Sequence, residues 1–152
     1  MIKTVALVAH DNRKKDLIEW VAYNYKRLMG KKLVCTGTTG QLVKKTMEQN
    51  MAGGEKINDI ILLKSGPLGG DQQLGAMIAE GEIDMLIFLW DPMEPQPHDV
   101  DVKALLRIAV MYNVPTANNR STADFLITSE LYNTDYQPLL KDYTTYINRT
   151  IK

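Results

Sequence analysis

Short apolar runs alternate with helix-like segments along most of this chain of 152 residues. The runs are TVALVA at 4–9, KLVC at 32–35, IILLK at 60–64 and MLIFLW at 85–90, with VPTAN at 114–118 as a weaker fifth. Apolar residues at a spacing of three or four follow the runs, which is typical of amphipathic helices. The alternation predicts parallel strands joined by crossover helices. We therefore expect an α/β fold with three αβα layers, Rossmann-like, around a five-stranded, mainly parallel sheet.

Three of the expected helices carry predictions about particular residues. One helix is expected from Gln72 to Glu80, after the turn SGPLGGD. Another is expected over STADFLI at 121–127, where the S-x-x-D pattern resembles a capping box and places the start at Ser121. In the tail after Tyr136, apolar and aromatic residues recur at helical spacing and predict a C-terminal helix. These residues are Tyr143, Tyr146, Ile147 and Thr150.

Composition bounds the partners of the chain. The length suits one domain over 1–152, with 45% apolar and 24% charged residues, as in ordinary globular proteins. Eighteen basic residues balance eighteen acidic ones, so no excess charge is present to neutralise nucleic acid, and we expect no such partner. The run at 85–90 is far shorter than the roughly 20 residues that span a bilayer, and we expect no membrane association. A single cysteine, Cys35, suits a reducing, cytoplasmic compartment.

The polar residues with chemical potential gather directly after the strands. Four strand ends are followed by HDNRK, TGTTG, SGPLGGD and DPMEPQPHDVD, which together hold both histidines and two glycine-rich turns. In open parallel sheets, ligands bind beyond the carboxyl ends of the strands. We therefore expect a single site to be built from these four turns.

The turn TGTTG at 36–40 has the composition of a phosphate cradle. Backbone amides at a helix N-terminus and the hydroxyls of Thr36, Thr38 and Thr39 could donate to a phosphate, and Gly37 lets the backbone approach it. The alternative is an ordinary turn in which a threonine caps the next helix. No G-K-[ST] follows, so the turn is not a Walker loop.

Two other residues have both a functional and a structural interpretation. Lys14 follows His10 by four residues and could reach an anion beyond the strand ends, or it could be a solvated surface lysine. Asp71 begins a helix just after Ser65 and Gly66, where it could act as a general base or as a simple N-cap.

His98 lies in a proline-rich loop beside Asp99 and Asp101. An imidazole there could shuttle a proton between substrate oxygens, or it could be a surface histidine beside helix-capping aspartates. His10 and Asp11 could join this cluster around a metal, but no H-x-H, H-E-x-x-H or paired cysteines are present, so we expect no metal. Cys35 lies within a strand and is a poor candidate nucleophile.

Together these segments resemble the methylglyoxal synthase family. The motifs that carry the resemblance cover most of the chain in order: LVAHD at 7–11 with Lys14, TGTTG, SGPLGGDQQLGAMIAEGEIDMLIF at 65–88, WDPMEPQPHDVDVKALLRIA at 90–109 and STADFLI. Two departures are a longer connection at 47–58 and a displacement of the basic residue Arg149 by one position. The resemblance implies a Rossmann-like fold, a homohexamer, and conversion of glycerone phosphate to methylglyoxal and phosphate without cofactor or metal.

The resemblance also implies a role for each site residue. Asp71 is the expected catalytic base, His98 contacts the substrate oxygens and Asp101 assists. The substrate is held by His10, Lys14, Thr36, Gly37, Thr38, Thr39, Ser65 and Gly66. Free phosphate, as product, is expected to inhibit by competing for the same cradle.

Two other functions keep part of this pattern. A regulatory module like that of carbamoyl phosphate synthetase would need the phosphate cradle but neither Asp71 nor His98, and it would be fused to a large enzyme. A metal-dependent hydrolase would use the His and Asp cluster and would lose activity to a chelator.

Overall fold

The structure is a computed structural model that describes residues 1–55 and 58–151. Its five strands form one parallel sheet in the order β3-β2-β1-β4-β5. The strands are β1 (Thr4–Ala9), β2 (Lys32–Thr36), β3 (Ile60–Leu63), β4 (Met85–Leu89) and β5 (Thr116–Ala117). The helices of the described part are α1 (Lys14–Leu28), α2 (Thr39–Asn50), α3 (Gly70–Ala79), α4 (Asp99–Met111), α5 (Arg120–Thr128) and the short α6 (Thr144–Ile147). Three 3-10 turns are η1 (Asp11–Arg13), η2 (Gly66–Leu68) and η3 (Glu130–Asn133).

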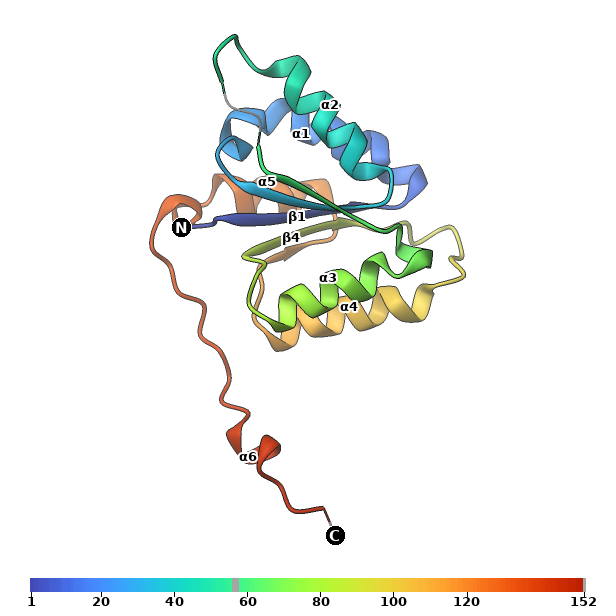
Figure 1. Cartoon of the computed structure of the whole chain (residues 1–152), viewed down its shortest axis with the longest axis vertical. Helices are drawn as coiled ribbons and strands as arrows, with labels where there is room; N and C mark the ends of the chain where they lie inside the picture. The colour runs from blue at the N-terminus through green and yellow to red at the C-terminus, as the bar shows by residue number, and fades with distance from the viewer. Residues whose placement is uncertain (56–57, 152) are drawn as a thin grey trace.

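Helices cover both faces of the sheet, which confirms the three-layer prediction (Figure 1). Helices α1, α2 and α5 lie on one face and α3 and α4 on the other. Along β1, Val5 and Leu7 point into the first core, whereas Ala6 and Val8 point into the second. Because parallel strands buried on both faces need apolar residues throughout, the runs read as continuous rather than alternating. Phe88 of β4 is completely buried in the second core.

The strand order places the carboxyl ends of β1 and β4 side by side. In the register, Ala9 pairs with Leu89, so the residues that follow both strands begin at the same level. The chain leaves β1 toward β2 and β3 on one side and reaches β4 and β5 on the other. Such a reversal opens a crevice at the strand ends where ligands bind in doubly wound sheets.

Several element boundaries differ from the predictions. The sheet is wholly rather than mainly parallel, and β5 is only two residues long. Helix α3 begins at Gly70, two residues before the predicted start at Gln72. The capping prediction for Ser121 was wrong: the side chain of Asn119 accepts a hydrogen bond from the Thr122 amide at 2.9 Å and is the N-cap of α5. Asparagine is as good a cap as serine, so the pattern alone could not separate them.

The C-terminal helix prediction is confirmed only over the four residues Thr144–Ile147. After η3 the chain runs away from the layers, and α6 is a single turn within this tail (Figure 1). Tyr146 and Ile147 are 63% and 72% exposed, so little of either side chain is buried. A short helix without packing partners is marginal in water. Within the longer connection at 47–58, the chain is irregular from residue 51 to residue 55, and residues 56–57 lie outside the described residues.

In the part of the chain that the structure describes, no helix is both long and apolar enough to cross a bilayer.

Candidate functional site

A cavity of about 270 Å³ opens at the carboxyl edge of the sheet, where the four polar turns meet. It is lined by every residue predicted for the site except Asp101. The predicted residues in its wall are His10, Lys14, Thr36, Gly37, Thr38, Thr39, Ser65, Gly66, Asp71 and His98. The segments that follow four strands thus contribute to one hollow, as expected for the carboxyl edge of a parallel sheet.

One wall of the cavity is the turn into α2. Gly37 has a φ of +56°, a left-handed conformation that favours glycine, and the turn delivers Thr39 as the first helical residue. Thr38 is the N-cap but makes no side-chain capping hydrogen bond. The Thr39 hydroxyl is buried and has no hydrogen-bond partner among the described residues. The helix N-terminus and this hydroxyl therefore offer donors to an anion.

The turn after β3 lies against the turn after β2. The Gly37 amide donates to the carbonyl oxygen of Lys64 at 3.2 Å, which ties the two turns together. Ser65 and Gly66 follow and begin η2 beside the cavity. A Cβ on Gly66 would lie 2.8 Å from His98 Nε2 and 3.1 Å from Asp71 Oδ2. Gly66 therefore leaves room for the two titratable side chains to meet.

Asp71 lies in the first turn of α3 but does not cap it. The N-cap is Gly69, at a φ of +105°, and no side chain caps this helix. Asp71 is only 3% exposed, and its Oδ2 has no hydrogen-bond partner among the described residues. Burial raises the pKa of Asp71, the nearby His98 opposes this rise, and Asp101 adds to it. The carboxyl is thus a stronger base than an exposed aspartate.

His98 also lines the cavity and lies close to Asp71. It ends the proline-rich loop and is the N-cap of α4, with its carbonyl oxygen accepting the Asp101 amide at 2.9 Å. Its Nε2 lies 3.6 Å from Asp71 Oδ2, beyond an ordinary hydrogen bond. Its Nδ1 is buried and has no partner in the described chain. The His98 imidazole and the Asp71 carboxyl can therefore both form hydrogen bonds with a ligand in the cavity.

Asp101 does not line the cavity. It is half-buried on α4 and lines a second hollow of about 340 Å³ between α3 and α4. Asp71 borders both hollows, and the charge of Asp101 contributes to its raised pKa. The structure thus places Asp101 behind Asp71 rather than in the wall of the cavity.

Lys14 supplies positive charge at the mouth of the cavity. It is the first residue of α1, and its ammonium group pairs with the exposed carboxylate of Asp11, whose pKa is lowered by this contact. An exposed pair of this kind contributes little to stability. Lys14 can therefore exchange Asp11 for a bound anion at small cost.

Three polar or cyclic side chains of the wall were not predicted: Asp11, Pro67 and Gln96. Each belongs to one of the four predicted turns, so the turns themselves were the available signal. Which side chain of a turn faces inward depends on the path of the loop, and the sequence does not give that path.

Two further observations concern the metal-ligating and thiol side chains. Within residues 1–55 and 58–151, no group of three or more His, Cys, Asp or Glu side chains could hold a metal ion. Cys35 is fully buried in β2, and burial raises the pKa of its thiol to about 12. Such a thiol is not a nucleophile near neutral pH.

Comparisons with known proteins agree with the geometry. Residues 16–118 match the model of the MGS-like domain. A methylglyoxal synthase of Maridesulfovibrio salexigens is 55% identical over 99% of this chain and 98% of its own length. One of Coxiella burnetii is 52% identical over 99% of both chains.

A solved structure extends the similarity to three dimensions. The crystal structure of methylglyoxal synthase from Elizabethkingia anophelis NUHP1 superimposes with a TM-score of 0.86. The two sequences are 47% identical, and the match covers 99% of this chain and 93% of the other. The fold, the strand-end cavity and these relatives together show that the chain belongs to the methylglyoxal synthase family.

Proposed function

We propose that the chain is a carbon–oxygen lyase that converts glycerone phosphate to methylglyoxal and inorganic phosphate. The observation that carries this proposal is the pairing of Asp71 with His98 in the cavity that the α2 turn also lines. A proton acceptor and a phosphate cradle thus line one cavity of about 270 Å³. Glycerone phosphate has a phosphate group for the cradle and, beside its carbonyl, an acidic proton for the acceptor.

The phosphate of the substrate is proposed to bind at the α2 turn. The amides at the N-terminus of α2, the free hydroxyl of Thr39 and the ammonium group of Lys14 are its donors, with Thr36, Thr38 and Ser65 around them. Gly37 and Gly66 allow the backbone to approach the ester. This orientation directs the carbonyl and hydroxymethyl groups toward His98 and Asp71.

Asp71 is the proposed base. The carbonyl acidifies the protons on the hydroxymethyl carbon, and the Asp71 carboxylate removes one of them, leaving an enediolate. Its raised pKa makes this carboxylate more basic, and its unpartnered Oδ2 is free to accept the proton. His98 is proposed to donate to the developing negative oxygen and to move protons between the two substrate oxygens.

Phosphate leaves in the second step. The hydroxyl on the deprotonated carbon gives up its proton and becomes an aldehyde, and the electron pair moves along the carbons and breaks the carbon–oxygen bond to phosphate. The enol that remains takes a proton on its terminal carbon and becomes methylglyoxal. Donors that already hold the phosphate make it a better leaving group. The two reaction steps move only protons and bonding electrons, so they need no external oxidant or reductant.

The stereochemistry of this step requires a particular pose. The bond to phosphate must stand roughly perpendicular to the enediolate plane for its antibonding orbital to overlap the π system. The position of the α2 turn relative to Asp71 therefore selects elimination over isomerisation.

Further parts of the proposal concern the setting of this reaction. Asp101, behind Asp71, is proposed to assist it electrostatically, and free phosphate is proposed to inhibit by occupying the α2 turn. We also propose a single domain over 1–152, a cytoplasmic location and a homohexamer. The exposed apolar residues of the tail support assembly, since they are unburied in one chain; they are Leu139, Leu140, Tyr146, Ile147 and Ile151.

The deciding experiment supplies glycerone phosphate to the purified protein in the presence of EDTA. We expect equal amounts of phosphate and dicarbonyl to appear. Activity lost to EDTA and restored by a divalent metal would instead support the hydrolase alternative. Phosphate binding without turnover would support the effector-binding module.

A further inference from the structure

His10 is anchored to the chain that follows β4 by two hydrogen bonds. Its backbone amide donates to the carbonyl oxygen of Leu89 at 3.2 Å, and its Nδ1 accepts from the backbone amide of Asp91 at 3.0 Å. An imidazole nitrogen that accepts a hydrogen bond carries no proton, so the proton of neutral His10 lies on Nε2. This Nε2 is buried, and none of the described residues accepts its proton.

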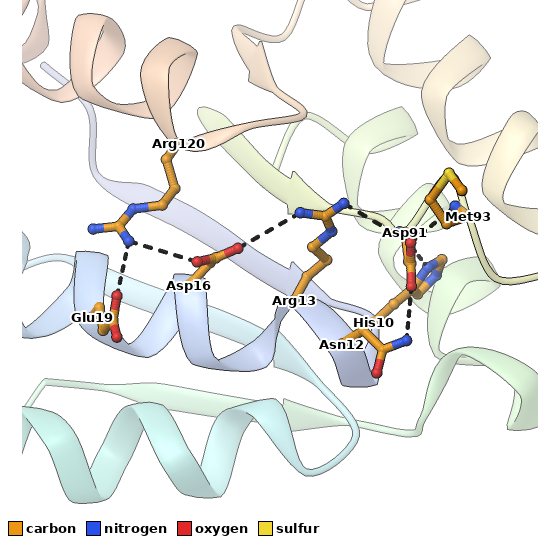
Figure 2. Close-up of polar contacts among 8 residues, drawn as sticks. All are labelled: His10, Asn12, Arg13, Asp16, Glu19, Asp91, Met93 and Arg120. Carbon is orange, nitrogen blue, oxygen red and sulfur yellow. Dashed lines mark hydrogen bonds and ion pairs between the residues drawn. The ribbon is translucent and has the colours of Figure 1, made fainter.

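The side chain of Asp91 holds the amide that contacts His10. Its Oδ2 accepts from Asn12 Nδ2 at 3.0 Å, and its Oδ1 accepts from the Met93 amide at 3.0 Å (Figure 2). Arg13 adds an ion pair at 4.0 Å. These contacts lower the pKa of Asp91, the Met93 amide most strongly. The carboxylate is thus buried and held by two hydrogen bonds, which restrain the turn that carries the backbone amide of Asp91.

The network continues outward along α1 to α5. Asp16 lies 3.7 Å from both Arg13 and Arg120, and Arg120 lies 2.9 Å from Glu19 (Figure 2). These outer side chains are about 40% to 50% exposed, so each pair contributes little. Among the described residues, Asn12 and the Met93 amide are the donors of hydrogen bonds to the Asp91 carboxylate.

We propose that Asp91 and Asn12 are positioning residues that fix His10 as its Nε2–H tautomer, so that it presents a neutral hydrogen-bond donor to an oxygen of the bound ligand. In a cationic imidazole or in the Nδ1–H tautomer, the N–H at Nδ1 would point at the N–H of the Asp91 amide. The repulsion between these two donors disfavours both of these states of His10. His10 and His98 lie edge to face with ring centroids 5.6 Å apart, so a neutral His10 also adds no charge beside His98. The identity of the ligand oxygen rests on the proposed function, whereas the tautomer does not.

Nitrogen NMR tests the tautomer directly. The chain has two histidines, so a 15N-labelled sample gives two imidazole patterns, which His98→Gln separates. We expect His10 Nδ1 to show the shift of an unprotonated nitrogen and Nε2 that of a protonated one. A proton found mainly on Nδ1 would overturn the proposal. The expected tautomer in a protein without lyase activity would leave this inference standing while the proposed function failed.

Two variants test the positioning role. Asn12→Ala removes one support of the Asp91 carboxylate, and Asp91→Asn keeps an acceptor for the Met93 amide in case Asn12→Ala misfolds. We expect either to mix the Nδ1–H tautomer into His10 and to lower kcat/KM for glycerone phosphate by roughly tenfold, the effect of one lost hydrogen bond. Glu19→Gln, at the far end of the network, is the matched control and should change neither. Unaltered tautomers in both folded variants would refute the role.

Discussion

The Oδ2 atom of Asp71 and the Nε2 atom of His98 face each other across 3.6 Å in a buried pocket, without forming a close hydrogen bond. Asp71 Oδ2 has no other partner in the described chain, so its lone pairs remain free for a substrate proton. The same contact partly offsets the effect of burial on the pKa of Asp71. The pair is thus arranged to act on a ligand rather than to stabilise the fold.

Replacement of Asp71 tests its role as the base. We expect Asp71→Asn to lower kcat by roughly a hundred- to ten-thousand-fold with little change in KM, because the amide cannot accept the proton. Exchange of the hydroxymethyl protons with deuterium should stop as well, which NMR of the substrate would show. Glu80→Gln, at the other end of α3, is the control for loss of a carboxylate from this helix. Undiminished exchange in Asp71→Asn would identify a different base.

The same variant should be more stable than the parent at neutral pH. Burial raises the pKa of Asp71 in the folded state, so folding favours the protonated carboxyl. Its contribution to stability is complete below the ordinary pKa of aspartate and is lost as the pH rises through the folded-state pKa. Asparagine does not ionise, so the variant does not lose this stability as the pH rises. Urea unfolding should therefore give Asp71→Asn the higher midpoint at pH 7, with the gap narrowing on acidification; a gap that widened in acid would contradict the shift.

Gly66 is expected to tolerate no side chain. An alanine Cβ would lie 2.8 Å from His98 Nε2 and 3.1 Å from Asp71 Oδ2, which forces the two groups apart. We expect Gly66→Ala to lower kcat at least tenfold and to destabilise the fold by about 1–3 kcal/mol. Steady-state kinetics and thermal unfolding provide the measurements.

Gly75→Ala is the matched control for this change. Nothing lies within 4 Å of a Cβ at Gly75 in the middle of α3, so alanine should stabilise the helix by about 1 kcal/mol and leave kcat unchanged. Equal activity of the two variants would show that the approach of Gly66 to the pair has no functional role.

The Thr39 hydroxyl should matter for the anion and not for the fold. It is buried without a partner in the described chain, so Thr39→Val should fold at least as stably as the parent. We expect its KM for glycerone phosphate and its inhibition constant for phosphate both to rise roughly tenfold, as one donor to a charged group is lost. Thr46→Val in the same helix removes a hydroxyl that donates to Leu42 and should lower stability without changing either constant.

The sequence was sufficient to predict the elements that are marked by a repeating pattern of apolar residues. The apolar runs predicted the strands, and Val5, Leu33 and Ile87 of these runs are completely buried. The rule for strand ends then predicted that His10, Thr39, Asp71 and His98 lie at one edge of the sheet. Periodicity and strand order are properties of neighbouring residues, and a single sequence records them.

Predictions of helix caps and helix lengths failed where they depend on contacts with residues far away in the sequence. Ser121 and Asn119 are both good caps, and only the path of the chain after β5 selects Asn119. Tyr146 and Ile147 have helical spacing but are largely exposed, and the helix that contains them is a single turn. The fold also decides which hollow a residue lines: Asp101 follows His98 by three residues but lines the hollow between α3 and α4, and its assisting role stays a prediction.

The sequence by itself determined the layered α/β fold, the turns that hold the chemistry and the family, because all of these reside in the order and spacing of residue types. Only the tertiary structure decided that Asp71 is buried beside His98 with a raised pKa, and that the Asp91 amide fixes His10. Burial, distance and hydrogen-bond direction arise between residues far apart in the chain, and they exist only once the sheet has brought its strand ends together.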